Sequence, residues 1–168
     1  SKVRQRLDEF DVEVDSIHRH ENAKKAVQNA DAIVVGGGNT FRLLQMIYQA
    51  GLIEEIRSRV LGGMPYVGWS AGANIVCPTI CTTNDMPITE PPSFNALNLV
   101  RFQINPHYLD AHPGGHAGET REQRILEFLE MQPHTFVVGL REGTMMLVED
   151  DSRKLLGPKS ARIFKRGF

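Results

Sequence analysis

The sequence predicts an α/β fold with a mostly parallel sheet and a small antiparallel part near the C-terminus. Two observations lead to this prediction. Short apolar runs rich in valine and isoleucine first alternate with amphipathic helical patterns, as in repeated β–α units. In the last quarter of the chain, short strand-like runs follow one another with only turn residues between them. The length of 168 residues fits one domain of ordinary size.

Five segments have the spacing of amphipathic helices. The clearest is 119–130, where Thr120 and Gln123 form a capping-box pair and Ile125 and Leu129 share the inward face. The predicted helices are 1–10, 20–30, 40–50, 52–61 and 119–130. The predicted strands are 11–17, 31–35, 65–69, 99–105, 135–140, 144–149, 154–157 and 161–165.

The start of the chain is unusual for this fold class. A parallel α/β domain commonly opens with a buried strand, whereas here a helical pattern comes first. We therefore expect residues 1–168 to form a single α/β domain that begins inside its own fold, without an opening strand–helix–strand portion.

Composition narrows the function classes. The 19 basic residues nearly balance the 20 acidic ones, and no basic stripe predicts nucleic-acid binding. No apolar run approaches the roughly 20 residues that span a bilayer, and no signal-peptide pattern is present. Cys77 and Cys81 lack the companion ligands of a zinc site and are expected to be reduced structural thiols. These observations favour a cytoplasmic protein without membrane or nucleic-acid partners.

The stretch Gly68-Trp69-Ser70-Ala71-Gly72 has the Gly-x-Ser-x-Gly pattern of a nucleophile elbow. It follows a strand-like run and precedes a helix, which is the context that the elbow requires. Small flanking residues let the turn close and leave the Ser70 hydroxyl exposed. The N–H of Ala71 at the start of the helix can hold a developing oxyanion. A plain turn serine is the alternative.

Polar elements follow four of the predicted strands. They are the glycines after Val35, Ser70, His107 just past Asn105, and Glu142 just past Leu140. The carboxyl ends of parallel strands share one edge of a sheet, where ligands bind in this fold class. We therefore expect these four elements to converge.

A serine nucleophile needs a base, and the chain has six histidines. His107 directly follows a buried strand, so it is the candidate base. The others are expected in solvated loops. A metal site from His107, His112 and His116 is an alternative that no carboxylate spacing supports. Glu142 and Asp85 are the rival carboxylates that could orient the base.

The run "VVGGGNTF" matches neither the P-loop pattern nor the dinucleotide-binding one. Three successive glycines can turn their N–H groups towards a ligand oxygen, so a phosphate site and an oxyanion hole are equally compatible with it. Asn39 or Thr40 can cap the helix that follows.

Six motifs in this order resemble those of the S51 family of serine peptidases, which includes α-aspartyl dipeptidases. They are "IVVGGGNTF", "GWSAGAN", "CTTNDMPI", "FQINPHY", "GHAGETREQRI" and "GLREG". The resemblance runs from about residue 12 almost to the C-terminus. It implies a flavodoxin-like three-layer sandwich of the class I glutamine amidotransferase kind, although those enzymes carry a cysteine at the elbow.

The resemblance also implies a function and a site. It implies a Ser70–His107–Glu142 triad, an oxyanion loop at Gly37 and Gly38, and hydrolysis of dipeptides that begin with aspartate. No cofactor or metal is implied.

The substrate also needs groups that recognise its two charges. Arg121 is the candidate partner for the aspartyl carboxylate, because arginine offers a bidentate fork. Asp85 or Glu119 could accept the substrate amine, and Asn39 completes the substrate-binding candidates.

The sequence is compatible with two other functions and with more than one oligomeric state. One is a family relative that cuts other aspartyl bonds, as cyanophycinases do. The other is a non-catalytic binder of small anions that uses the glycine loop. A homodimer is compatible with the sequence.

Overall fold

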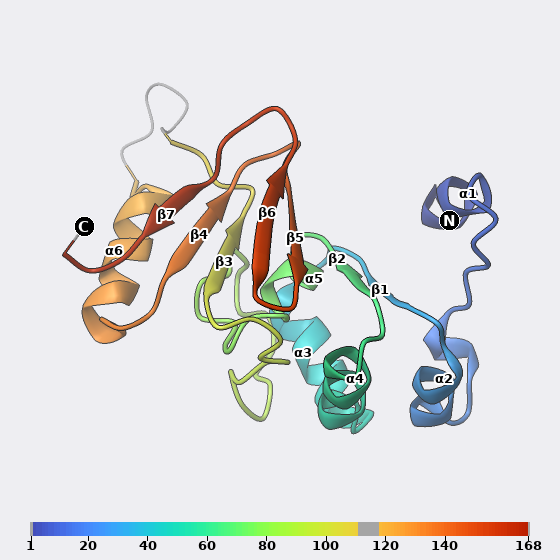
Figure 1. The fold of residues 1–168 in the computed structure, drawn as a ribbon. Coiled ribbons are helices and arrows are strands. Elements are labelled where there is room, and N and C mark those ends of the chain that lie inside the picture. Colours follow the sequence, from blue (N-terminus) through green and yellow to red (C-terminus); the bar gives the residue numbers. More distant parts are fainter. Residues whose placement is uncertain (1, 111–117, 168) are drawn as a thin grey trace.

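The computed structural model describes residues 2–110 and 118–167 of the chain (Figure 1). Helices and strands alternate up to β4 and are followed by three further strands, as predicted. The helical elements are α1 (Lys2–Asp8), η1 (Ile17–Arg19), α2 (Ala23–Asn29), α3 (Thr40–Gln49), α4 (Ile53–Leu61), α5 (Ala71–Asn74) and α6 (Arg121–Met131). The strands are β1 (Ile33–Val35), β2 (Tyr66–Gly68), β3 (Gln103–Pro106), β4 (Val137–Leu140), β5 (Met145–Glu149), β6 (Ser152–Leu156) and β7 (Arg162–Phe164).

The described strands form three sheets. β1 and β2 are parallel, with Val35 opposite Gly68. β3 and β4 are also parallel, with Pro106 opposite Leu140, and β7 extends this sheet antiparallel to β4. β5 and β6 form an antiparallel hairpin. The mixed parallel and antiparallel character agrees with the prediction, and the antiparallel strands are those nearest the C-terminus.

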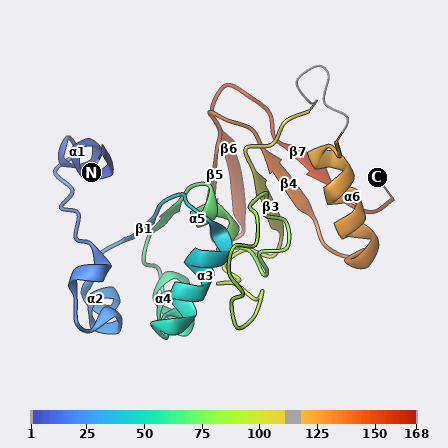
Figure 2. The same cartoon turned by 180° about the vertical axis from the view of Figure 1, so that it is seen from behind.

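Each parallel pair packs against its own helices. Around β1 and β2, buried side chains of α2, α3 and α4 form the largest apolar cluster, which includes Leu44, Ile56 and Val27. On the other sheet, Ile125 and Leu129 of α6 pack with Val137. Seen from behind, α6 covers one face of the β3–β4–β7 sheet (Figure 2).

The predicted caps are present. The N–H of Gln123 donates to Thr120 Oγ1 at 3.1 Å, and the N–H of Thr120 donates to Gln123 Oε1 at 2.7 Å. Together these bonds make the capping box at the start of α6. Asn39 is the cap of α3, because its Oδ1 accepts from the N–H of Arg42 at 3.0 Å.

One predicted strand is absent and two others differ from the prediction in burial or length. Residues 11–17 form no strand; Val12 there is 43 % exposed and has no neighbouring strand to pair with among the described residues. β1 is not fully buried, since Val34 is 41 % exposed. β3 begins only at Gln103, because the N–H groups of Leu99 and Val100 bond instead to the carbonyl of Val76.

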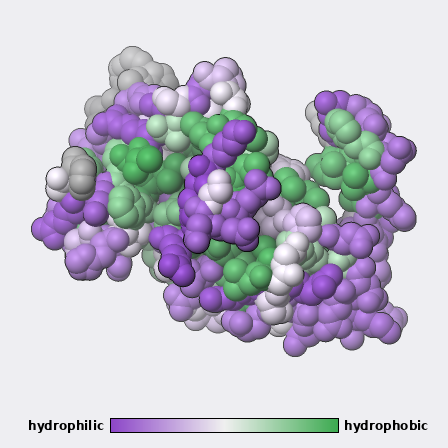
Figure 3. All heavy atoms as spheres, viewed as in Figure 1, coloured by the Kyte–Doolittle hydropathy of each residue, from purple (hydrophilic) through white to green (hydrophobic). Residues whose placement is uncertain are grey.

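The surface is mixed in character. On the face seen in Figure 3, the polar β5–β6 hairpin stands between apolar areas. The exposed apolar residues include Val67 on β2 and Ile163 on β7.

In both ribbon views α1 stands apart from the sheets, at one end of the molecule. No helix in residues 2–110 or 118–167 is both long and apolar enough to cross a bilayer.

Candidate active site

Ser70 sits on a sharp turn between β2 and α5. Its backbone has φ 55° and ψ −116°, a conformation that costs energy for a residue other than glycine. The glycines on either side make the turn possible. A Cβ at Gly68 would come 2.5 Å from the carbonyl oxygen of Gly72, and one at Gly72 would come 2.1 Å from the carbonyl oxygen of Val35. The chain therefore needs glycine at both positions to hold a serine between them.

The glycine loop after β1 lies against this turn. A Cβ at Gly37 would be 3.2 Å from the Cβ of Ser70 and 3.5 Å from its Oγ. Gly38 has φ 145°, and a Cβ there would meet nothing within 4 Å. The N–H groups of Gly38 and Ala71 donate to no acceptor among the described residues. They are free to bind an oxygen atom.

His107 and Glu142 meet at the ends of β3 and β4. His107 Nδ1 forms a short hydrogen bond with the Glu142 carboxylate, and both side chains remain partly exposed. A carboxylate can only accept hydrogen bonds, so Nδ1 carries the hydrogen in this pair. In a neutral imidazole this leaves Nε2 with a lone pair, as a general base requires.

The backbone before His107 is held by two side chains. The carbonyl of Pro106 accepts from Asn84 Nδ2 at 2.8 Å and from Arg121 Nη1 at 2.9 Å. Asn105 Nδ2 donates to Asn84 Oδ1 at 2.9 Å, which fixes the orientation of that amide. These bonds brace the chain where His107 adopts a positive φ of 55°.

Asp85 lies in the loop between α5 and β3 and contacts the N-terminus of α3. Its Oδ2 accepts from the N–H of Thr40 at 2.7 Å and from Thr40 Oγ1 at 2.6 Å. A carboxylate at a helix N-terminus satisfies free N–H groups and complements the helix dipole. Among the described residues, Asp85 forms no hydrogen bond with His107, which is paired with Glu142 instead.

The remaining substrate-binding candidates occupy different settings. Arg121 is half-buried, and burial lowers the pKa of its guanidinium, helped by the nearby charge of Arg124. Glu119 forms an ion pair with Arg124, at 3.5 Å from Nε. Asn39 Nδ2 donates to the carbonyl of Met86 at 2.8 Å, which ties the glycine loop to the Asp85 segment.

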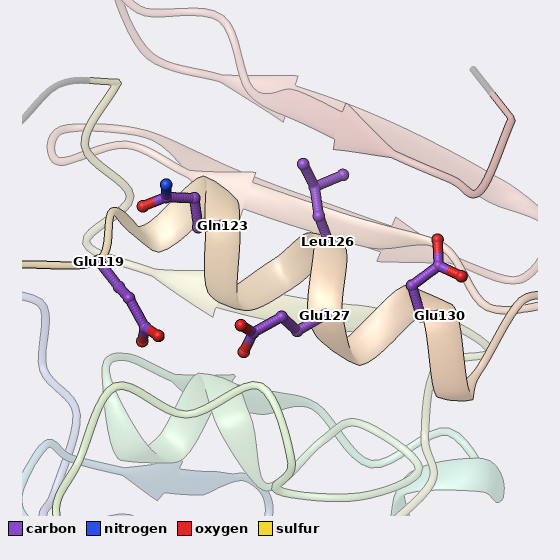
Figure 4. A pocket seen from close by; sticks show the side chains of 5 residues that line it. All are labelled: Glu119, Gln123, Leu126, Glu127 and Glu130. Carbon is purple, nitrogen blue, oxygen red and sulfur yellow. The ribbon is translucent and has the colours of Figure 1, made fainter.

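A depression on α6 is acidic. In Figure 4 the carboxylates of Glu119 and Glu127 project to the same side of this helix. Its lining residues are Glu119, Gln123, Leu126, Glu127 and Glu130. Three carboxylates repel a further negative charge, so this depression does not suit an aspartyl side chain.

His20, Cys77 and Cys81 take part in none of these contacts. His20 binds Asp15 at 2.5 Å, and this bond lowers the pKa of the Asp15 carboxyl. His112 and His116 lie outside the described residues, so the alternative metal site is not tested. Within the described part of the chain, no three His, Cys, Asp or Glu side chains are grouped to hold a metal. Cys77 is buried and Cys81 exposed, and both are free.

The structure thus brings Gly37 to Ser70 and His107 to Glu142. It shows no hydrogen bond between Ser70 and His107 among the residues that it describes. Sequence reasoning missed the amides that brace the histidine. Asn105 could have been noticed, because it is a polar residue inside a strand-like run that is expected to be buried.

Known proteins are similar to this chain over most of its length. The model of peptidase family S51 matches residues 1–156. A peptidase E from Nostoc is 52 % identical over 166 residues, covering 99 % of this chain and 69 % of its own length. Another, from Streptomyces coelicolor, is 51 % identical over 168 residues, covering 99 % of this chain and 69 % of its own length.

A solved structure is also similar. A protein from Listeria monocytogenes designated a peptidase E superimposes with a TM-score of 0.67 at 25 % identity, over 87 % of this chain and 67 % of its own. The resemblance read from the motifs is confirmed, and the chain is a peptidase that belongs to peptidase family S51.

Proposed function

We propose that the protein is a serine dipeptidase with Ser70 as nucleophile, His107 as base and Glu142 as the group that orients the base. The observation that carries this proposal is the hydrogen bond between His107 and Glu142 at the strand ends. It leaves Nε2 of the imidazole available to accept a proton. Ser70 stands on the strained turn at the end of a neighbouring parallel strand pair, next to the glycine loop.

The reaction is acyl transfer in two steps. Ser70 Oγ attacks the scissile carbonyl while His107 takes its proton, and the N–H groups of Gly38 and Ala71 bind the oxyanion, with Gly37 keeping the loop close. The leaving amine takes the proton from His107. Water then attacks the acyl-enzyme by the same steps in reverse, and no metal or cofactor takes part.

The proposed substrates are dipeptides with an N-terminal aspartate. Two charges must be recognised, the aspartyl carboxylate and the free amine. Arg121 is the proposed carboxylate partner because its half-buried guanidinium forms no ion pair within the described residues. Asp85 is proposed to face the amine with its second oxygen, and Glu119 is the alternative. Asn39, which directly follows the glycines, ties them to the Asp85 segment through its bond to the Met86 carbonyl.

The proposal extends to the arrangement of the fold, the cellular location and the oligomeric state. We propose the flavodoxin-like three-layer arrangement, supported by the two parallel strand pairs that each end in chemistry-bearing residues. We also propose a cytoplasmic location and leave a homodimer as an expectation.

The test combines a probe with a substrate panel. A fluorophosphonate should label the wild type and a Ser58→Ala control. Among the described residues, the Ser58 hydroxyl bonds only to the Glu55 carbonyl of its own helix. Ser70→Ala should not be labelled and should lose activity on the order of a million-fold. Activity of Ser70→Ala within tenfold of the wild type would rule out the serine mechanism.

The panel then assigns the substrate class. Asp-X dipeptides should be cleaved and Asn-X and Glu-X analogues poorly cleaved, because a neutral ligand leaves the cation unpaired. Cleavage of other aspartyl bonds in preference would favour the cyanophycinase-like alternative. Absence of labelling and turnover would favour an anion binder.

A further inference from the structure

Charged neighbours flank both members of the His107–Glu142 pair. Asp110 lies three residues after His107, and Arg141 directly precedes Glu142. Arg141 donates from Nε to Asp110 Oδ2 at 2.8 Å and from Nη2 to Asp110 Oδ1 at 2.5 Å. This is the two-pronged geometry of the strongest arginine–carboxylate pairs. The pair joins the segment after β3 to the end of β4.

The third nitrogen of the guanidinium is also used. Arg141 Nη1 donates to the carbonyl oxygen of Ser160 and, at 3.1 Å, to its Oγ. The guanidinium carbon lies 5.7 Å from the ring centre of Tyr108, within cation–π range. The side chain of Arg141 is only 19 % exposed. Its donors are therefore occupied by the protein and are not offered to a substrate carboxylate.

The segment between His107 and Asp110 is fastened to β4 at a second point. The N–H of Tyr108 donates to the carbonyl of Leu140 at 3.0 Å. The buried ring of Tyr108 packs on Gly139 and lies edge-to-face with Phe164 at 5.5 Å. This bond and the Asp110 fork together fasten His107 and the residues that follow it to the strand that leads to Glu142.

We propose that Arg141 is a positioning residue. Its bidentate bond to Asp110 holds the segment after His107 in place and thereby keeps the His107 imidazole hydrogen-bonded to Glu142. The inference rests on the proposed function, since it concerns the same base. Asp110 is 53 % exposed, so the pair adds little stability, but the bidentate bonds from the mostly buried Arg141 fix the orientation of both side chains. The hydrogen bond from Arg141 also lowers the pKa of the Asp110 carboxyl, so the carboxylate stays charged at neutral pH.

The experiment compares Arg141→Met, Asp110→Asn and their double variant with Arg166→Met. Arg166 is the matched control, because its ion pair with Glu130 at 3.0 Å joins half-exposed side chains far from His107 in the sequence. Arg141→Met and Asp110→Asn should each lower kcat for Asp-X dipeptides by roughly 10- to 100-fold with KM nearly unchanged. The double variant should be no worse than the poorer single one, and Arg166→Met should match the wild type.

A second readout does not depend on turnover. In protein whose histidines carry an isotope label, the Nδ1 proton of His107 should give the NMR signal of a hydrogen-bonded N–H. This signal should weaken in Arg141→Met and Asp110→Asn and persist in Ser70→Ala. The proposed function can therefore fail through Ser70 while this inference stands. Asp110→Asn preserves side-chain size, so it remains informative if Arg141→Met does not fold. An unchanged kcat and signal, additive losses, or a rise in KM with kcat intact would each overturn the positioning role.

Discussion

Gly37 lies directly against Ser70, so close that a methyl group at Gly37 would stand 3.5 Å from the serine Oγ. Two strands that are far apart in sequence, β1 and β2, create this contact because they pair in parallel and end side by side. The glycine loop and the elbow are thus one unit, and the proposed mechanism places the scissile carbonyl beside both of them.

The first prediction follows from this contact. Gly37 lacks a positive φ, so Gly37→Ala requires no unusual backbone, but its Cβ would come 3.2 Å from the Cβ of Ser70. We expect the variant to fold, with a loss of melting temperature of a few degrees at most, and to lose roughly tenfold or more in kcat because Ser70 is displaced. Steady-state kinetics with a thermal melt check this. Wild-type turnover in Gly37→Ala would show that the loop has room to spare.

The second prediction separates the two carboxylates. Glu142→Gln keeps the shape but stabilises the wrong imidazole tautomer, so kcat should fall on the order of 1,000- to 10,000-fold with little change in KM. Asp85→Asn weakens the cap that Asp85 provides to Thr40 and should cost about 1 kcal/mol of stability. It should mainly raise KM, because the carboxylate is proposed to face the substrate amine. The reverse kinetic pattern would make Asp85 the orienting group.

The third prediction concerns the aspartyl carboxylate. Arg121→Met removes the proposed cation and should cut the preference for Asp-X over Asn-X by about 30- to 160-fold, as loss of a charged hydrogen bond of roughly 2–3 kcal/mol implies. Arg124→Met is the control, since Arg124 lies on the same helix and pairs with exposed Glu119. Competition between the two dipeptides measures the preference. If Arg121→Met discriminates as the wild type does, another group binds the carboxylate.

The sequence predicted most of the elements and the residues at their ends. Periodicity and capping signals are local, so α6 with its Thr120 cap was predicted from its own residues. Strand 11–17 failed because alternation says nothing about whether a partner strand stands beside it. The contacts that brace the backbone before His107 could not be predicted, because Asn84 and Arg121 reach the Pro106 carbonyl only through the packing of distant segments.

The fourth prediction tests the packing beneath the base. A Cβ at Gly139 would lie 2.7 Å from the ring of Tyr108, which is fully buried against Phe164 and cannot retreat. Gly139→Ala should therefore destabilise the protein by roughly 1–3 kcal/mol. It should also lower kcat, because Tyr108 directly follows His107. Adding Tyr108→Leu should recover stability in denaturant titrations. Neither effect is expected if β4 can move away from the ring.

The last prediction concerns the two thiols, which form a natural matched pair. Cys77 is fully buried, its Sγ accepts from the N–H of Ile104 at 3.2 Å, and burial raises its pKa from 9.0 to about 12. Cys81 is exposed. A thiol reagent at pH 8 should modify one cysteine per native chain and both in denaturant. Modification of Cys77 at the rate of Cys81 would contradict the packing of Cys77 against Ile104 of β3.

The same burial gives a pH dependence with a definite sign. Below pH 9 the Cys77 thiol is neutral in both the folded and the unfolded chain, so it adds no pH dependence to stability. Between about pH 9 and 12 the unfolded chain loses the proton while the folded chain keeps it, so the free energy of unfolding should fall as pH rises. Cys77→Ala should remove that slope and cost about 1–3 kcal/mol, because the N–H of Ile104 loses its acceptor. Cys81→Ala should retain both the slope and the stability, and urea titrations at pH 7 and pH 10 distinguish the two variants.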